Sequence, residues 1–149
     1  MLFFAYLNLP GPKPREDVVL GMTFSPRYAA GLGLDWKEVY TAMLDDLQVR
    51  KLRVSLYWDL AEPQKDRYDF SELDWELQEA QKRNAEAIVA VGLKVPRWPE
   101  CHIPEWAKED EALRRREMLE MIELTVKRYK DNKAVTTWQV ENEPFLPFG

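Results

Sequence analysis

The stretch Trp138-Gln139-Val140-Glu141-Asn142-Glu143-Pro144 determines how this sequence is interpreted. Its first three residues end a short run at 135–140. Two acids and an amide follow this run, and then a proline. Pro144 ends the run, because proline has no N–H to donate to a neighbouring strand. The pattern predicts a strand whose tip carries a carboxylic acid beside an amide. In parallel α/β folds the strand tips are where chemistry takes place.

Upstream of this tip, hydrophobic residues follow strand-like and helix-like periods in turn. We expect strands at 17–25, 52–57, 87–93 and 135–140, loops at 26–33, 58–68 and 94–106, and helices at 35–47, 71–84 and 110–130. Asp35 with Glu38 three residues later has the spacing of a helix N-cap and its capping-box partner. Ser71 is the expected cap of the second helix. Alternating strands and helices predict a parallel sheet with right-handed crossovers.

Two architectures fit that order: an open doubly wound sheet and a (β/α)8 barrel. The first strand–helix turn lacks the glycine-rich phosphate fingerprint of dinucleotide folds. Long loops after the strands, rich in Trp, Arg and acids, favour the barrel. A complete barrel needs about 250 residues, and this sequence has 149. The predicted fold class is therefore α/β, with residues 17–149 forming the first half, about four strands and three helices, of a (β/α)8 TIM barrel.

The first sixteen residues form a separate segment, in which an apolar stretch at 1–9 precedes Pro10-Gly11-Pro12-Lys13-Pro14. Two interpretations are weighed equally: a remnant of a signal or membrane anchor, and a disordered or loosely docked N-terminus. We slightly favour an extracytoplasmic or membrane-anchored location over a cytoplasmic one. No run in the sequence reaches the ~18 apolar residues of a full membrane span.

Charge and cysteine usage argue against several classes of partner. The net charge is −5 and the longest basic run is Arg114-Arg115-Arg116, so nucleic acid is not an expected partner. Cys101-His102 with nearby Glu100 and Glu105 resembles a metal cluster. The chain has one histidine, however, and without a second histidine a zinc site is not expected.

Aromatic and polar residues gather where the strands end. Tryptophan stacks on the apolar face of a pyranose, while carboxylates and amides bind its hydroxyls. A carboxylic acid near a glycosidic oxygen can also protonate the leaving group. The residues of this kind are Arg53, Tyr57, Trp58, Asp59, Glu62, Arg97, Trp98, Glu100, His102, Trp138, Asn142 and Glu143.

Residues 138–144 resemble the fourth-strand motif of the clan A glycoside hydrolases, a superfamily of (β/α)8 barrels that includes cellulases, mannanases and β-galactosidases. Arg53 in the segment 52–58 is similar to the arginine that those families carry on the second strand. Trp58, Glu62-Pro63 and Tyr68-Asp69-Phe70 are similar to their segment leading into the second helix. The resemblance runs from about residue 18 to 144.

The resemblance implies a role for each matching residue. Glu143 would be the general acid and then the base. Asn142 would bind the sugar 2-hydroxyl, and Arg53 would hold the nucleophilic carboxylate ionised. Trp58, Trp98, Trp138 and His102 are the other candidate substrate-binding residues. No cofactor or metal is implied. On the residues alone, Glu143 as a plain surface acid and Arg53 as an interstrand ion-pair partner stay open.

In those families the nucleophile is a glutamate on the seventh strand, which this sequence does not reach. We therefore expect a retaining glycoside hydrolase acting on a poly- or oligosaccharide, of which this chain carries the acid/base and is inactive alone. The alternative is a non-catalytic half-barrel that binds carbohydrate or self-associates through its open sheet edges. An unrelated α/β enzyme is a third possibility.

Overall fold

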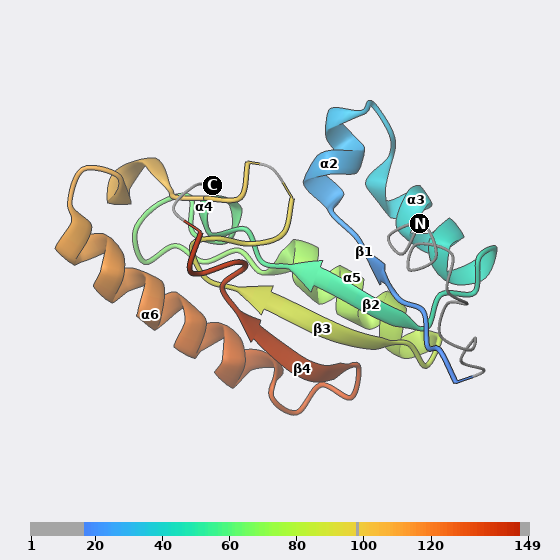
Figure 1. The fold of residues 1–149 in the computed structure, drawn as a ribbon. Coiled ribbons are helices and arrows are strands. Elements are labelled where there is room, and N and C mark those ends of the chain that lie inside the picture. Colours follow the sequence, from blue (N-terminus) through green and yellow to red (C-terminus); the bar gives the residue numbers. More distant parts are fainter. Residues whose placement is uncertain (1–16, 98, 147–149) are drawn as a thin grey trace, which may run out of the picture.

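The computed structural model describes residues 17–97 and 99–146. Its centre is a four-stranded parallel sheet in which the strands lie in sequence order, as Figure 1 shows. Strand β1 is Met22–Thr23, β2 is Lys51–Ser55, β3 is Glu86–Val91 and β4 is Val135–Val140. The predicted strand–helix alternation and parallel pairing are confirmed. All four strands point their carboxyl ends toward the same end of the molecule.

The helices connect successive strands. They are α2 (Pro26–Gly31), α3 (Trp36–Asp45), α4 (Trp58–Ala61), α5 (Ser71–Lys82) and α6 (Glu111–Tyr129), with the 3-10 turn η1 at Glu105–Ala107. Asp35 caps α3 as expected, because its Oδ1 accepts from Lys37 N and Glu38 N at 2.9 and 3.2 Å. Ser71 is not a cap: it is the first residue of α5, and Asp69 Oδ1 accepts from its backbone N–H at 2.8 Å.

Two segments expected to be loops contain short helices, and both matter for the site. Helix α2 forms within 26–33 because Ser25 Oγ accepts from Tyr28 N at 3.1 Å and Pro26 occupies the first turn, where a missing N–H costs nothing. Helix α4 forms at the start of 58–68. Both helices directly follow the carboxyl end of a strand, so they border the region where a site is expected (Figure 1).

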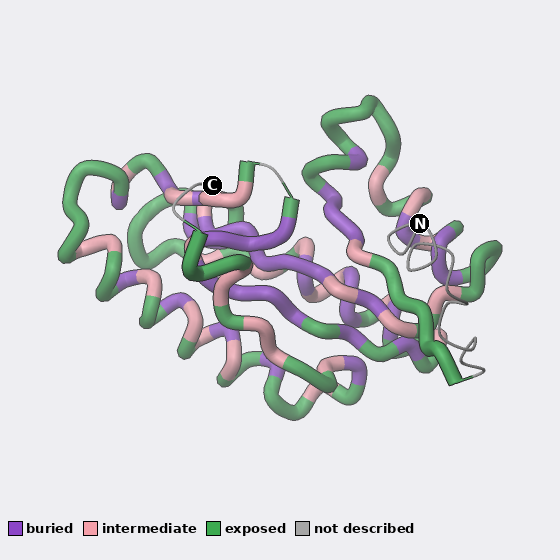
Figure 2. Tube along the Cα trace, in the orientation of Figure 1, coloured by how far each residue is buried: buried purple, intermediate pink, exposed green. Residues whose placement is uncertain are grey.

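The prediction of a buried first strand over 17–25 is wrong. Only Met22–Thr23 pair with β2, and Val18, Val19 and Leu20 are 60–83% exposed. Residues 18–20 precede β1, which in the described chain pairs with β2 alone. Figure 2 shows this exposed segment beside the buried strands β2 and β3, and it also shows that β4, the other edge of the sheet, is only partly covered.

The core lies between the sheet and the helices. Leu44 of α3, Leu77 of α5 and Met121 of α6 pack with Val54 and Val89 of the sheet, and all five side chains are fully buried. Burying one such side chain stabilises the fold by about 1.5–3 kcal/mol. Trp36 of α3 and Trp75 of α5 meet edge to face, with their ring centroids 5.0 Å apart, and so join the two helices.

The segment at 1–16, with the expected leader or linker, lies outside the described residues. Among the helices that the structure describes, none has both the length and the apolar character needed to cross a membrane.

One acid is buried in this core without a hydrogen-bond partner for its carboxylate among the described residues. Glu76 of α5 is fully buried, and among the described residues neither carboxylate oxygen has a hydrogen-bond partner. Burial raises the pKa of Glu76 well above its usual value of 4.5, and the nearby charge of Glu72 raises it further. The folded protein therefore holds a proton on Glu76 at pH values where the unfolded chain has lost it.

This buried acid predicts a pH-dependent stability. Below about pH 4.5 Glu76 is protonated in both states, and stability is lost as the pH rises through the raised pKa of the folded state. We expect Glu76→Gln to be more stable than wild type at neutral and alkaline pH, with the difference shrinking toward acid. Urea unfolding across pH measures it, with exposed Glu109→Gln as the control. Parallel stability curves for wild type and Glu76→Gln would contradict the assignment.

Candidate active site

A hydrogen-bonded row of side chains runs across the sheet to the tip of β4. Arg53 on β2 donates from Nε to Thr23 Oγ1 at 3.0 Å and from Nη1 to Gln139 Oε1 at 3.3 Å. Gln139 on β4 donates in turn to Asn142 Oδ1 at 3.1 Å. The row therefore places Arg53 and Asn142 on one face of the sheet with a single residue between them.

Gln139 was not predicted as a site residue. The observed register places Gln139 opposite Ala90, and Ala90 lies opposite Ser55 of β2. Ser55 is two residues after Arg53 and therefore shares its face of the sheet.

Glu141 holds the tip of β4 against the loop that follows β3. Its carboxylate accepts from Leu93 N at 2.8 Å and from Lys94 N at 2.7 Å. The close approach depends on Gly92, whose φ is +132° and where an added Cβ would lie 2.5 Å from Glu141 Oε1. Glu141 itself adopts φ 64°. Glu141 is therefore a structural acid.

Asn142 is fixed by two further contacts with the same loop. Its backbone N–H donates to Lys94 O at 2.7 Å, and its Nδ2 donates to Glu100 Oε1 at 3.1 Å. Glu100 also lies 3.4 Å from Lys94 Nζ. The carboxamide is therefore held at both ends, by Gln139 on the strand and by Glu100 on the loop.

Glu143 follows this fixed residue in a tight turn, in which Leu146 N donates to Glu143 O at 3.0 Å. Its φ of 48° is left-handed, a conformation that costs a non-glycine residue about 1 kcal/mol or more. The side chain is exposed, and within the described ranges its carboxylate makes no hydrogen bond or ion pair. Its role therefore stays a prediction.

Arg53 has no carboxylate partner among residues 17–97 and 99–146. The alternative in which Arg53 pairs with an acid of a neighbouring strand is therefore wrong for the described sheet. A guanidinium has five N–H donors, and two of its three nitrogens are engaged by Thr23 and Gln139. The remaining donors suit a carboxylate or a sugar hydroxyl.

Of the tryptophans predicted to bind substrate, Trp58 belongs to the core and Trp138 packs against it. Trp58 is fully buried in α4, where its Nε1 donates to Glu62 Oε2 at 2.8 Å and its ring meets Trp106 edge to face. Trp138 packs against the core between sheet and helices, because strand alternation turns it away from the face that carries Gln139. Trp58 therefore has no exposed face for a sugar, whereas Trp138 is half-buried and its expected contact with substrate stays a prediction. Trp98 lies outside the described residues.

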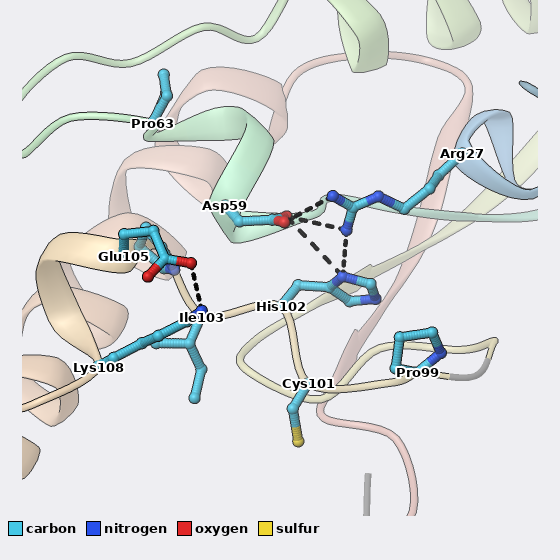
Figure 3. A pocket seen from close by; sticks show the side chains of 10 residues that line it. Arg27, Asp59, Pro63, Pro99, Cys101, His102, Ile103, Glu105 and Lys108 are labelled. Atoms are coloured by element: carbon cyan, nitrogen blue, oxygen red, sulfur yellow. Dashed lines mark hydrogen bonds and ion pairs between the residues drawn. The ribbon is translucent and has the colours of Figure 1, made fainter. Parts of the chain in front are cut away.

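His102 lies apart from the row, beside two charged residues from other loops. Arg27 of α2 donates from Nη1 to His102 Nδ1, and Arg27 also forms a two-pronged ion pair with Asp59 of α4, at 2.7 and 3.3 Å (Figure 3). An imidazole nitrogen that accepts a hydrogen bond carries no proton. Burial lowers the pKa of His102. The charge of Asp59 acts in the opposite direction, and the charge of Arg27 lowers the pKa further. His102 is therefore neutral, with its proton on Nε2.

Three carboxylates lie within 4.8 Å of one another at Glu62, Asp66 and Glu117. Their buried oxygens already have partners: Glu62 accepts from Trp58 Nε1 and Asp66 N, while Glu117 pairs with Lys65 at 3.1 Å and Arg116 at 2.8 Å. The charge of Glu117 is therefore balanced by Lys65 and Arg116, and the bond from Asp66 N to Glu62 anchors the loop after α4.

The geometry around Gly92 yields a stability prediction. Gly92→Ala places a methyl group on Glu141 and requires an unfavourable φ, so we expect a loss of about 1–3 kcal/mol. Gly31→Ala is the matched control, because nothing lies within 4 Å of its Cβ and its φ is ordinary. Urea unfolding measures both variants. Equal stability of Gly92→Ala and wild type would show that the tip and the loop do not meet as described.

Comparisons with known proteins agree with this arrangement of elements. No protein-family model matches the chain. The beta-galactosidase LacZ of Lactobacillus acidophilus is 29% identical over 104 residues, which are 58% of this chain and 16% of that protein.

Solved structures share the fold. A beta-galactosidase from Halorubrum lacusprofundi superposes with a TM-score of 0.66 at 19% identity and covers 87% of this chain and 22% of that one. Gan42B, a GH42 beta-galactosidase from G. stearothermophilus, gives 0.62 at 19%, with 83% and 21% covered. The exo-beta-1,4-mannosidase Op5Man5 from an Opitutaceae bacterium gives 0.61 at 17%, with 85% and 25% covered.

The chain thus spans about a fifth of the length of these relatives. Its structural neighbours are clan A glycoside hydrolases with (β/α)8 barrels, so the predicted fold class is confirmed as part of such a barrel. The resemblance to clan A glycoside hydrolases, first seen in residues 138–144, holds in both sequence and fold.

Proposed function

We propose that this chain carries the proton-donor side of a retaining glycoside hydrolase site, with Glu143 as the general acid and then the base. The supporting observation is the row from Arg53 through Gln139 to Asn142, which ends at the residue before Glu143. Glu143 follows the last residue of β4 by three positions, and the carboxyl ends of the strands are where (β/α)8 enzymes place their catalytic groups.

Glu143 and two residues of the row, Asn142 and Arg53, each have a chemical role in this proposal. Glu143 protonates the glycosidic oxygen as the bond to the sugar breaks, then removes a proton from the water that releases the product. Asn142 Nδ2 has two N–H groups and spends one on Glu100, which leaves the other for a sugar 2-hydroxyl. Arg53 holds the nucleophilic carboxylate ionised and oriented.

The nucleophile is a second carboxylate, about 5–5.5 Å from the first in retaining enzymes. The acids near the described strand ends have other partners: Asp59 binds Arg27, Glu62 binds Trp58, and Glu100 binds Asn142. We therefore propose that the nucleophile lies on a later strand and that the 149-residue chain does not hydrolyse glycosides alone. The named relatives support a β-linked oligo- or polysaccharide as the substrate class.

The test joins this chain to strands five to eight of the Halorubrum lacusprofundi barrel and measures hydrolysis of aryl β-glycosides. We expect Glu143→Gln to lower kcat by about 10²–10⁴ on a nitrophenyl glycoside. The loss should be smaller on a dinitrophenyl glycoside, because a better leaving group needs less protonation.

Glu109→Gln, an exposed acid before α6, is the matched control and should leave kcat unchanged. Equal rates for Glu143→Gln and Glu109→Gln on both substrates would contradict the role of Glu143. Turnover by the unjoined chain that Glu143→Gln abolishes would contradict the proposed need for a later strand.

We also infer that the unjoined chain self-associates through its sheet edges. Within the described residues β1 and β4 each pair on one side only, and Val140 and Leu20 are 58% and 83% exposed. Unpaired edges with apolar side chains favour pairing with a second copy. Sedimentation velocity of the unjoined chain decides: an oligomer supports this inference, and a monomer at every concentration contradicts it.

A further inference from the structure

A hollow of about 590 Å³ lies beside the proposed catalytic site, within the roughly 300–1,000 Å³ of small-molecule sites. It is bordered by α2, by α4 and by the loop between β3 and α6, as Figure 3 shows. Its lining comprises Arg27, Asp59, Pro63, Pro99, Cys101, His102, Ile103, Pro104, Glu105 and Lys108. All three segments follow carboxyl ends of strands, so the hollow opens at the same end of the sheet as Glu143.

The charges of this hollow cancel. Arg27 pairs with Asp59, Lys108 pairs with Glu105, and His102 is neutral because Arg27 donates to its Nδ1 and burial lowers its pKa. No unpaired cation is left among these residues to attract a phosphate or an acidic sugar. Paired carboxylate and guanidinium groups still hydrogen-bond hydroxyls, so the lining suits a neutral polyol.

The remaining wall is apolar and rigid. Pro63, Pro99, Pro104 and Ile103 present ring and aliphatic carbons to the hollow. A pyranose has an apolar C–H face and a rim of hydroxyls, so it needs this combination of carbon surface and paired polar groups. Because proline side chains have little freedom to lose, ordering this wall around a ligand costs little entropy.

The hollow is separate from the catalytic row but shares a wall with it. Glu143, Asn142 and Arg53 do not line it. Glu100 lies in the chain between the lining residues Pro99 and Cys101, and its Oε1 accepts from Asn142 Nδ2 at 3.1 Å. The loop itself is closed by Val95 N donating to Glu100 O and His102 N donating to Leu93 O, both at 3.0 Å.

We propose that this hollow is a second subsite, which binds one neutral sugar residue of an oligosaccharide whose next units reach Glu143. The proposal rests on the glycosidase function proposed above and adds that the substrate is longer than the unit cleaved. Arg27 and Asp59 bind the sugar hydroxyls. His102 is a positioning residue: with its Nε2 buried, it orients Arg27 and does not touch the sugar.

The experiment uses the fact that His102 is the one histidine of the chain. Its imidazole C–H signals in the NMR spectrum of the 149-residue chain therefore report on the hollow alone, while the side-chain amides of Gln139 and Asn142 report on the catalytic row. The probes are β-1,4-linked gluco-, manno- and galactotetraoses and the matching monosaccharides. We expect at least one tetraose to shift the His102 signals saturably at concentrations where its monosaccharide does not.

Asp59→Ala removes a hydroxyl acceptor and releases Arg27, so we expect tetraose binding at least 10-fold weaker. Glu123→Ala breaks a comparable surface ion pair, with Lys127 on α6, and should leave the affinity unchanged. If Asp59→Ala does not fold, the double variant Glu105→Ala/Lys108→Ala removes the exposed pair of the hollow, and we expect it to weaken binding as well.

Three results would overturn the proposal. A tetraose that shifts the Gln139 and Asn142 amide signals but not the His102 signals would contradict the second subsite and remain consistent with the proposed function. Binding at His102 that neither the Asp59 variant nor the double variant weakens would place the ligand elsewhere. A uronic-acid tetraose that binds more tightly than every neutral one would refute the neutral class. Shifts at His102 without any at Gln139 and Asn142 would instead count against the proposed function.

Discussion

The carboxylate of Glu141, which accepts from the backbone N–H groups of Leu93 and Lys94, is the interaction on which the rest of this site depends. It joins the tip of β4 to the loop after β3, and only glycine at position 92 leaves room for it. Hydrogen bonds to a charged acceptor contribute about 1.5–3 kcal/mol each. Once the two segments are joined, Asn142 reaches both Lys94 and Glu100, and the loop that borders the hollow is held in place.

Buried charges in this chain are neutralised locally, and the exception is informative. Glu62 and Glu117 are buried but are hydrogen-bonded or ion-paired by Trp58, Asp66, Lys65 and Arg116, and they fix the loop after α4. Glu76 has no such partner among the described residues, so the fold holds it protonated. Arg27 and Asp59, which line the hollow, likewise neutralise each other, and both groups can still bind hydroxyls.

Much of this architecture could be predicted from sequence, because periodicity and capping are local signals. The β4 motif, the parallel order and the cap at Asp35 follow from residues close together in the chain. Helix α2 was missed although Ser25-Pro26 carries a cap and a first-turn proline. Trp58 was misplaced because a tryptophan just after a strand looks like a sugar platform. The counter-signal was Glu62 four residues later, which a helical turn brings to the indole N–H.

The rest depends on long-range geometry. Gln139 lies between Arg53 and Asn142 only once strand register is known, and the contact between Arg27 and His102 joins residues 75 positions apart. Local pattern cannot supply such pairings, since they arise from the crossover helices that bring the strand ends together. The exposed side chains of 18–20 show the same limit, because an apolar run indicates burial but not what covers it.

The most direct test of this account is amide hydrogen exchange in wild type and Glu141→Ala. If Glu141 joins the strand tip to the loop, its removal should speed exchange of the Leu93 and Lys94 amides by about 10- to 100-fold. The Asn142 amide, which donates to Lys94 O, should speed up with them, while amides shared between β2 and β3 keep their wild-type rates. Faster exchange at Leu93 and Lys94 with an unchanged Asn142 would contradict the claim that one carboxylate holds the site together.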